Sequence, residues 1–344
     1  MTDKQVRWAL LSTARINERL MEPIRRAARS RLVGVASRSE DKAAAYARKW
    51  KIPRAYGSYE QLLADRDIDA VYISLPNGLH TEWSVRCADA GKHVLCEKPL
   101  ALTVEEADRL EQAARRNAVV IQEAAMMRFH PQMEHIRKLL ADGTIGRVRL
   151  LRGVFTYVLN DPTDVRLDPS QGGGALWDLG SYCVRFMRTV MGREPQQVVA
   201  SQVTADSGVD LSLAGQLHFP GGALAQFYCS LESFGHVEAD LLGSEGRLQV
   251  TSPWANQPGY DAHVHLSRHD GSPPRGNWDD GMLNQTIETK TYRDSDAYQM
   301  EVESMLASIL DGTEPTIPLA DSRRNAAVIQ SLLRSAREGK VIAC

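Results

Sequence analysis

Residues 6–122 alternate between short apolar runs and longer amphipathic segments, and this alternation constrains the fold more than any other feature. The runs with the length and composition of buried strands cover residues 6–11, 32–36, 70–75, 93–96 and 119–122. The segments with helical spacing between them cover residues 17–30, 42–50, 59–64, 81–90 and 104–116. Strands that alternate with helices predict a doubly wound parallel sheet with both faces covered. We therefore predict an α/β Rossmann domain that binds a dinucleotide over residues 1–125.

The pattern changes after Pro131, where longer segments alternate between apolar and polar residues with a period of two. A Pro-Gly-Gly turn joins residues 211–219 to 223–231, which predicts a hairpin. Further strands are predicted at residues 147–157, 197–204, 237–242 and 247–250, helices at 132–141, 298–310 and 323–337, and an exposed loop at 271–281. We therefore predict that residues 126–344 form an α+β domain for substrate binding and oligomerisation, with a large open, mainly antiparallel sheet. A second subunit covering that sheet would give a homodimer or homotetramer.

Composition excludes several classes of partner. The 344 residues include 41 Lys plus Arg against 43 Asp plus Glu, so no excess positive charge attracts nucleic acid or an anionic membrane. The apolar runs are strand-sized, whereas a membrane span needs roughly 20 residues, and no signal peptide is expected. The five cysteines are odd in number and show no close pairing, as expected for reduced thiols. We expect a cytoplasmic protein with a small-molecule partner.

The tripeptide Glu97-Lys98-Pro99 closes the predicted strand 93–96. Proline fixes its own φ and keeps the preceding residue out of helical geometry, so Lys98 is held extended at a strand end. In a parallel sheet that end faces the ligand crevice. Because a tripeptide arises easily by chance, Lys98 is a candidate only in this context.

The turn after the first strand lacks the expected glycines. Ser12, Ala14 and Asn17 stand where G-x-G-x-x-G would place them. Small residues still permit a pyrophosphate to approach the backbone, so this motif alone leaves dinucleotide binding and a plain strand-to-helix turn equally open. The cofactor-binding candidates in this turn are Ser12, Thr13, Ala14, Arg15 and Ile16.

The second strand ends in Ser37 and Arg38, where an enzyme that prefers NAD(H) usually shows an acidic residue for the ribose hydroxyls. A guanidinium can instead pair with a 2′-phosphate and stack on adenine. This pair predicts a preference for NADP(H) over NAD(H). The alternative for Arg38 is a solvated side chain at a helix start.

The third strand is followed by Leu75, Pro76, Asn77 and His80, which should lie at the same edge of the sheet as Glu97 and Lys98. We expect these residues to contact the cofactor, and His80 is also a weaker candidate for substrate contact. Alternatively, Asn77 satisfies turn backbone, and His80 caps the helix that begins near Thr81.

In the second half, a glycine run leads into Asp178 and Tyr182, which share one face if the segment is an α-helix. An ammonium nearby favours phenolate, so Lys98 could make Tyr182 a usable base. The alternative is a core tyrosine with Asp178 as an N-cap. Arg166, before the glycine run, is a further candidate for substrate contact. His263 and His265 lack a nearby third ligand and predict a surface pair rather than a metal site.

These motifs together resemble the Gfo/Idh/MocA family of oxidoreductases over nearly the whole chain. The resemblance rests on residues 69–77, His80, residues 91–99, 128–131 and 172–182. It implies two domains and a catalytic role for Lys98. Tyrosine rather than histidine at Tyr182 resembles the branch of dihydrodiol dehydrogenase, NADP-dependent xylose dehydrogenase and glucose-fructose oxidoreductase, which uses NADP(H). The chain departs from the family at Ser12, Ala14 and Asn17.

We therefore expect reversible hydride transfer between NADP(H) and a carbinol or carbonyl of a sugar or cyclic polyol or diol, without a metal. Tyr182 would act as acid/base, Lys98 would stabilise the developing charge, and Asp178 would orient substrate hydroxyls. Two alternatives stay open. One is a nicotinamide-dependent glycosidase of the same fold, and the other is a non-catalytic NADP(H)-sensing protein.

Overall fold

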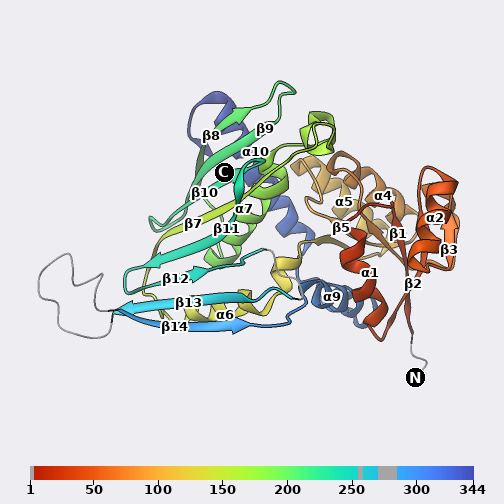
Figure 1. Cartoon of the computed structure of the whole chain (residues 1–344), viewed down its shortest axis with the longest axis horizontal. Helices are drawn as coiled ribbons and strands as arrows, with labels where there is room; N and C mark the ends of the chain where they lie inside the picture. The colour runs from red at the N-terminus through yellow and green to blue at the C-terminus, as the bar shows by residue number, and fades with distance from the viewer. Residues whose placement is uncertain (1–3, 255–258, 270–284) are drawn as a thin grey trace, which may run out of the picture. The chain divides into compact units, whose positions relative to one another are not determined.

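The computed structural model describes residues 4–254, 259–269 and 285–344, so the loop predicted at 271–281 lies outside the described residues. The chain forms two compact units (Figure 1). The first comprises residues 1–129, 170–172 and 297–327. The second comprises residues 130–169, 173–296 and 328–344.

The first unit contains a six-stranded parallel sheet with the order β3-β2-β1-β4-β5-β6. The strands are β1 (Val6–Leu11), β2 (Ser30–Ala36), β3 (Arg54–Tyr56), β4 (Ala70–Ile73), β5 (His93–Glu97) and β6 (Ile121–Ala124). The helices are α1 (Asn17–Arg26), α2 (Glu40–Trp50), α3 (Tyr59–Ala64), α4 (His80–Asp89), α5 (Val104–Asn117) and α9 (Ala297–Asp311). This architecture confirms the predicted doubly wound fold. Among the described residues of this unit, the short edge strand β3 and the 3₁₀ turns at Asn77–Leu79 and Met126–Phe129 were not predicted.

Local sequence explains where the helices of this unit begin. Ser39, Ser58 and Thr103 are N-caps of α2, α3 and α5, and each side chain accepts a hydrogen bond from a backbone N–H of the first turn. On one face of the sheet, apolar side chains of β4 and β5 pack with Trp83 and Cys87 of α4 and Leu110 of α5. These contacts hold the strand ends in a fixed register.

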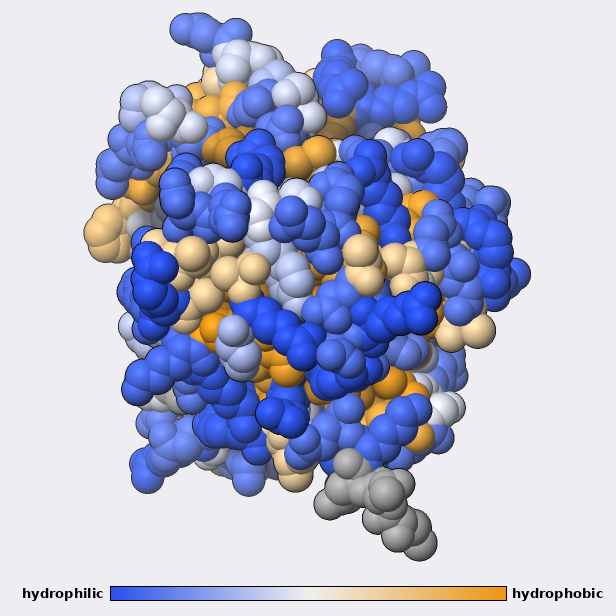
Figure 2. All heavy atoms as spheres, turned by 90° about the vertical axis from the view of Figure 1, so that its right-hand side faces the viewer, coloured by the Kyte–Doolittle hydropathy of each residue, from blue (hydrophilic) through white to orange (hydrophobic). Residues whose placement is uncertain are grey.

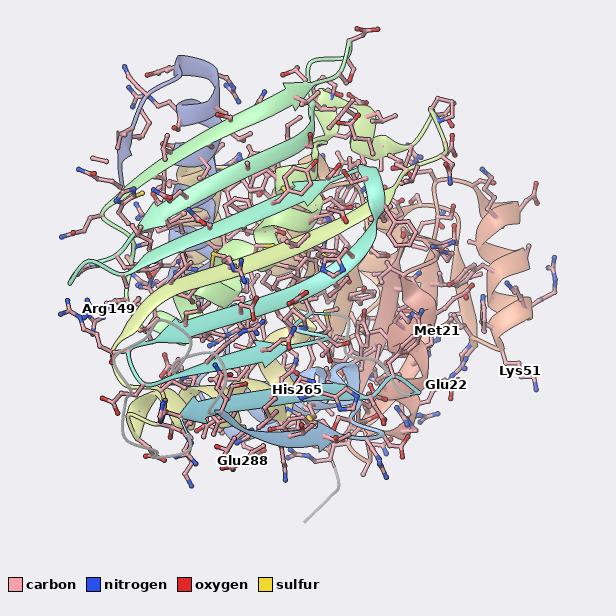
Figure 3. The ribbon with its side chains drawn as sticks, turned by 60° about the vertical axis from the view of Figure 1, so that its left-hand side comes forward. Met21, Glu22, Lys51, Arg149, His265 and Glu288 are labelled. Atoms are coloured by element: carbon pink, nitrogen blue, oxygen red, sulfur yellow. The ribbon has the colours of Figure 1, made fainter. Side chains whose placement is uncertain are left out.

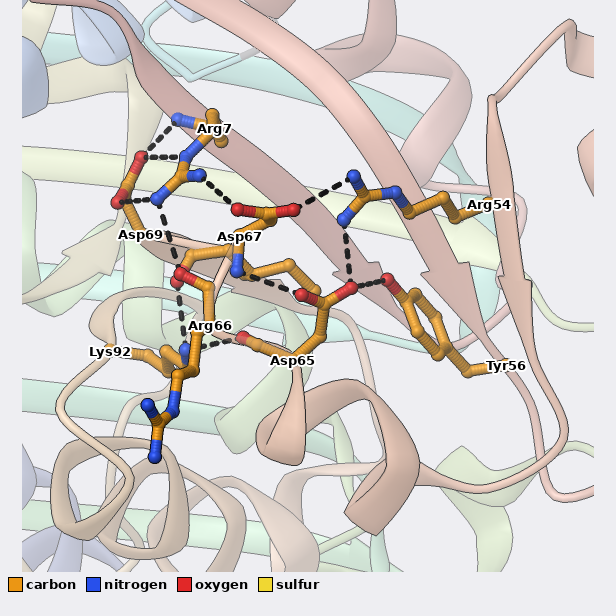
Figure 4. A network of polar contacts seen from close by, with 9 residues as sticks. Arg7, Arg54, Tyr56, Asp65, Arg66, Asp67, Asp69 and Lys92 are labelled. Carbon is orange, nitrogen blue, oxygen red and sulfur yellow. Dashed lines mark hydrogen bonds and ion pairs between the residues drawn. The ribbon is translucent and has the colours of Figure 1, made fainter.

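A network of ion pairs lies where β1, β4 and β5 begin (Figure 4). Arg7 Nε lies 2.8 Å from Asp69, and Arg7 Nη1 lies 2.7 Å from Asp67. Burial opposes ionisation of Asp69, but the hydrogen bonds and charge of Arg7 outweigh it and lower the pKa of that carboxyl. The buried Lys92 ammonium donates to the carbonyls of Asp65 (2.7 Å) and Ile68 (2.8 Å). Ion pairs and hydrogen bonds therefore connect the strand starts at the amino edge of the sheet. The predicted site residues of this unit lie at the opposite, carboxyl edge.

The second unit is built on a nine-stranded sheet with the order β14-β13-β12-β11-β7-β10-β9-β8-β15. Its strands are β7 (Val148–Val158), β8 (Gln197–Thr204), β9 (Asp210–His218), β10 (Leu224–Ser230), β11 (Glu232–Gly243), β12 (Gly246–Val250), β13 (Ala262–His269), β14 (Gln285–Tyr292) and β15 (Ile342–Ala343). β7 pairs with β10 in parallel, and the other pairs are antiparallel. The mainly antiparallel sheet and the β9–β10 hairpin are thus confirmed.

Among the described residues, the α-helices α6 (Pro131–Ala141) and α7 (Ser181–Met191) belong wholly to this unit. α7 buries Cys183, Phe186 and Met187 and contacts β7. Figure 3 shows the sheet with its side chains, among them His265 of β13 and Glu288 of β14. Large apolar side chains are also exposed on its strands, with Phe234 90% and Ile287 68% accessible. Helix α10 (Leu319–Glu338) contributes its first part to the first unit and its last part to the second.

Among the described residues, no helix has both the length and the apolar character needed to cross a bilayer. The face seen in Figure 2 is mostly hydrophilic, and its hydrophobic residues lie in separate small groups.

Candidate functional site

Lys98 lies directly after β5 at the carboxyl edge of the parallel sheet, as predicted. The Lys98–Pro99 peptide bond is cis. The Glu97 carboxylate accepts hydrogen bonds from the Tyr72 hydroxyl at one oxygen and from Lys98 N at the other (3.3 Å). Burial raises the pKa of Glu97, while the Tyr72 hydrogen bond and the Lys98 charge oppose that shift. Tyr72, which sequence reasoning missed, therefore holds the residue next to Lys98.

His80 is the first residue of α4 and is fully buried. One ring nitrogen lies 2.8 Å from Pro99 O and the other 2.7 Å from Leu75 O. Burial lowers the pKa of His80, against the effect of the two carbonyl groups. His80 thus ties the loop after β4 to the loop after β5. Its predicted contact with a ligand stays a prediction.

Asn77 stands in a 3₁₀ turn and donates through Nδ2 to Gly172 O (2.9 Å). Gly172 has φ +70°, and a Cβ there would lie 2.5 Å from a methyl group of Leu102. Glycine is therefore required both by the backbone and by the space. Gly172, the first glycine of the run, therefore lets residues 170–172 pack against Asn77 and Leu102 of the first unit.

The turn after β1, which lacks the expected glycines, is held by hydrogen bonds of polar side chains. Ser12 adopts φ +130°, a region that favours glycine. Its Oγ lies 3.0 Å from Ser74 O and 2.7 Å from Ser74 Oγ, and its carbonyl accepts from Asn17 Nδ2 (2.9 Å). Ser74 Oγ in turn donates to Asn17 Oδ1 (2.6 Å). Three buried polar side chains thereby fix the turn between β1 and α1.

The turn after β1 and the end of β2 carry the residues predicted to bind a dinucleotide. The N-cap of α1 is Ile16, which makes no side-chain cap hydrogen bond, and the N–H groups of the first turn donate to the carbonyls of Ala14, Arg15 and Ile16. Ser37 Oγ accepts from Ser39 N (3.3 Å) and shapes the loop after β2. Arg38 is exposed, and no acidic side chain in the described part of the chain forms an ion pair with it. A 2′-phosphate would supply the missing negative partner.

In the second unit, Asp178 lies within a polar cluster that sequence reasoning had only partly outlined. Asp178 Oδ2 accepts from Arg166 Nε (2.8 Å) and from the Tyr157 hydroxyl (2.9 Å). Arg166 Nη1 also pairs with Asp164 (3.1 Å). Burial and the charge of Asp178 raise the pKa of Tyr157, which stays a neutral donor. Arg166 and Asp178 are therefore brought together, and Tyr157 joins them from β7.

The segment carrying Asp178 differs from the predicted α-helix. Leu176–Gly180 is π-helical, and α7 begins at Ser181. Such turns occur often at functional sites. The Tyr182 ring packs edge-on against Phe155, with 5.6 Å between the centroids, and is half-buried. The predicted pairing of Tyr182 with Lys98 stays a prediction, since the two residues belong to different units.

Asp178 is not the N-cap of this segment: the N-cap is Ala175, and Asp210 of β9 accepts a hydrogen bond from the first backbone N–H of the segment. Asp210 is buried and accepts a hydrogen bond from Leu176 N (2.6 Å). Gly174 has φ +112°, and a Cβ there would lie 2.1 Å from Asp210 Oδ1. The glycine run is needed partly because this carboxyl approaches the backbone. Burial raises the pKa of Asp210 to about 6.

Replacement of Asp210 by asparagine is expected to flatten the dependence of stability on pH. The folded protein holds the Asp210 proton more tightly than the unfolded chain, so its contribution is greatest below about pH 4 and falls as pH rises through about 6. A shift of about two pKa units corresponds to about 3 kcal/mol. Asparagine stays neutral and can still accept from Leu176 N. Urea unfolding at pH 4.5 and 7.5 should show a smaller difference for Asp210→Asn than for wild type, whereas exposed Asp206→Asn should behave like wild type. Parallel behaviour of the two variants would contradict this.

The doubly wound parallel sheet, with Lys98 at its carboxyl edge, is typical of a Rossmann dinucleotide-binding domain. Comparison with known families agrees with this. Residues 6–125 match the model for the oxidoreductase family with an NAD-binding Rossmann fold, and residues 133–249 match the Gfo/Idh/MocA C-terminal domain. The chain belongs to the Gfo/Idh/MocA oxidoreductase family.

Individual relatives are similar along most of their length. A D-xylose 1-dehydrogenase (NADP(+)) of Haloferax volcanii is 32% identical over 336 residues, 97% of this chain and 98% of the relative. A trans-1,2-dihydrobenzene-1,2-diol dehydrogenase of Danio rerio is 38% identical over 249 residues, 71% of this chain and 74% of the relative. A 3-ketoreductase of Actinomadura kijaniata, solved with NADP and TDP-benzene, superposes with a TM-score of 0.87 at 28% identity, covering 96% of this chain and 98% of that one.

Proposed function

We propose that this protein is an NADP(H)-dependent oxidoreductase that transfers a hydride between nicotinamide and a carbinol or carbonyl group of a sugar or cyclic polyol or diol. The observation that carries the proposal is Lys98, held after β5 by Glu97 and Pro99 at the carboxyl edge of a doubly wound sheet. Relatives named for xylose and dihydrodiol oxidation support the substrate class.

In this proposal residues 1–125 bind the cofactor and residues 126–344 bind the substrate. The pyrophosphate would lie at the turn of residues 12–16, the 2′-phosphate at Ser37 and Arg38, and the remainder along Leu75, Pro76, Asn77, His80, Glu97 and Lys98. The chemistry that a bound nicotinamide would supply there is reversible hydride transfer with the substrate carbon.

In this proposal, side chains of the protein transfer the proton and stabilise the developing charge. In the oxidation direction Tyr182 takes the hydroxyl proton, and the Lys98 ammonium stabilises the oxygen as negative charge develops. Asp178, held by Arg166 and Tyr157, orients a neighbouring substrate hydroxyl. Arg166 contributes further donors to the same substrate. In reduction Tyr182 gives its proton to the carbonyl oxygen.

A substrate screen tests the proposal. Aldoses, inositols and cyclic diols are offered with NADP⁺ and NAD⁺, and ketoses with NADPH, while absorbance of the reduced cofactor is followed. Turnover of at least one compound class with net cofactor reduction is expected. Release of an aglycone without net reduction would instead indicate the glycosidase, and cofactor-dependent partner binding without turnover would indicate the sensor.

Arg38→Ala is expected to weaken NADP(H) binding by about tenfold or more while changing NAD(H) binding little. The reason is that only the 2′-phosphate distinguishes the cofactors, and a charged hydrogen bond contributes about 1.5–3 kcal/mol. Fluorescence titration with NADPH and NADH measures both constants. Arg48→Ala, also an arginine variant on this unit but at the other end of α2, is the control. Equal affinity of the wild type for both cofactors, or an unchanged preference in Arg38→Ala, would refute the assignment.

We further propose a homodimer or homotetramer formed through the open sheet of the second unit. The exposed Phe234, Ile287 and Tyr228 on its strands support this, because solvent-exposed apolar groups of this size are costly. Light scattering of the wild type and of Phe234→Lys tests the proposal, and a monomeric wild type would refute it.

A further inference from the structure

Two buried carboxyls, Glu123 and Glu301, lie near the Glu97 carboxyl and have no role in the proposed hydride transfer. Glu123 of β6 is 2% accessible and Glu301 of α9 is fully buried, and both face the Glu97 carboxyl closely enough for their charges to interact. Three carboxyls in one apolar region cannot all be ionised without a large cost. The hydrogen-bond partners of Glu97 and Glu301 therefore determine which of these two carboxyls is easier to ionise.

Glu301 is the member without a hydrogen bond. Within the described residues neither of its carboxyl oxygens has a hydrogen-bond partner. The Ala125 N–H, which faces it, donates to the Glu123 carbonyl instead (3.1 Å). Burial, together with Glu97 and Glu123, raises the pKa of Glu301 well above its usual value. Burial and the neighbouring carboxyls therefore favour the neutral form of Glu301.

Glu97 is the member placed to be the anion. The fully buried Tyr72 hydroxyl and Lys98 N each donate to its carboxylate, and the Lys98 charge also favours ionisation. An ionised Glu301 would push Glu97 towards protonation. A protonated Glu301 removes that repulsion.

We propose that Glu97 fixes the charge and position of Lys98, and that Tyr72 and Glu301 are positioning residues that act through Glu97. The inference rests on the proposed role of Lys98 and extends it to groups that need not touch cofactor or substrate. A negative Glu97 beside Lys98 favours the ammonium form. Tyr72 keeps Glu97 negative by hydrogen bonding, and Glu301 does so by carrying the proton itself.

The groups that face this site come from five elements of the first unit. They are Tyr72 from β4, Glu97 and Lys98 from the end of β5, Glu123 from β6, His80 from α4, and Tyr298 and Glu301 from α9, while Ala125 after β6 contributes its backbone. Burial lowers the pKa of His80, while its contacts with the carbonyls of Pro99 and Leu75 oppose that shift. Lys98 is the cation whose charge favours ionisation of Glu97.

Competitive acetylation of lysines in the intact, cofactor-free protein, read by peptide mass spectrometry from pH 6 to 11, tests the inference. The midpoint of Lys98 reactivity should move to lower pH in Glu97→Gln, which removes the negative charge beside it, and less in Tyr72→Phe, which keeps the charge but removes the hydrogen bond that holds the carboxylate. The alkaline limb of the kcat/KM profile should move in the same direction. Tyr59→Phe, a buried tyrosine packed against Trp83 in the same unit, should leave both unchanged.

Glu301→Gln separates charge from structure. Glutamine is uncharged and nearly isosteric, so a neutral Glu301 predicts an unchanged Lys98 midpoint. A midpoint in Glu301→Gln shifted by half a unit or more would show that Glu301 is ionised and overturn this part. Unchanged midpoints in both Tyr72→Phe and Glu97→Gln would overturn the inference as a whole. If Lys98→Ala retains wild-type turnover, the proposed function fails, whereas loss of activity in Lys98→Ala with unmoved midpoints removes only this inference.

Discussion

Lys98→Ala is expected to lower kcat/KM by about a hundredfold to a thousandfold. The ammonium is proposed to face the oxygen that becomes negative as hydride leaves carbon, and removal of one such electrostatic donor costs about 2.7–4 kcal/mol. Because Glu97 loses its positive neighbour in the same variant, the buried site also becomes less favourable for a negatively charged oxygen. Initial rates on the best substrate of the screen, with saturating cofactor, measure the effect.

Two controls make this result specific. Lys49→Ala changes a lysine that is 65% exposed in the last turn of α2, and it should retain wild-type kcat/KM. Thermal unfolding of Lys98→Ala should stay close to wild type, so that the loss reflects chemistry rather than folding. Near wild-type turnover of Lys98→Ala would remove Lys98 from the mechanism.

Tyr182→Phe is expected to lower kcat by a hundredfold to ten-thousandfold, with a smaller change in KM. General acid–base catalysis contributes about 10²–10⁴, and phenylalanine can neither take nor give the proton. The Tyr182 ring packs edge-on against Phe155, and phenylalanine preserves that contact. The pH dependence of kcat that reports ionisation of the base should disappear in the variant.

Tyr260→Phe is the matched control, because Tyr260 is 67% exposed and is assigned no role. Its kcat and pH profile should match the wild type. A Tyr182→Phe enzyme that keeps both its rate and its pH profile would show that another group moves the proton. Tyr157, which donates to Asp178 in the same unit, would then be the next residue to test.

The parallel sheet could be predicted because its strands are buried on both faces and its helices carry their own signals. Ser39, Ser58 and Thr103 cap the helices that follow them, and α3 begins and ends at the predicted residues. Strand β3 escaped prediction because Arg54–Tyr56 is a short edge strand with partly exposed side chains, which produces no apolar period. The π turn at Leu176–Gly180 escaped because its start depends on Asp210, a residue of a different strand.

The candidate site was predictable only where a residue's position along a strand decides its role. Lys98, Arg38 and the turn after β1 follow directly from strand ends. Tyr72 and Tyr157 did not stand out, because each sits within a strand and gains its meaning from a partner elsewhere, Glu97 for one and Asp178 for the other. No spacing rule links such pairs.

The side-chain hydrogen bonds of the turn after β1 have an evolutionary consequence. Ser12, Asn17 and Ser74 satisfy one another inside the protein, so loss of any one side chain leaves a buried polar atom of another unpaired. A return to the glycine motif by single steps would pass through destabilised intermediates. These three positions are therefore expected to be inherited as a set. Each lineage is expected to keep either the glycine motif or the combination of Ser12, Asn17 and Ser74.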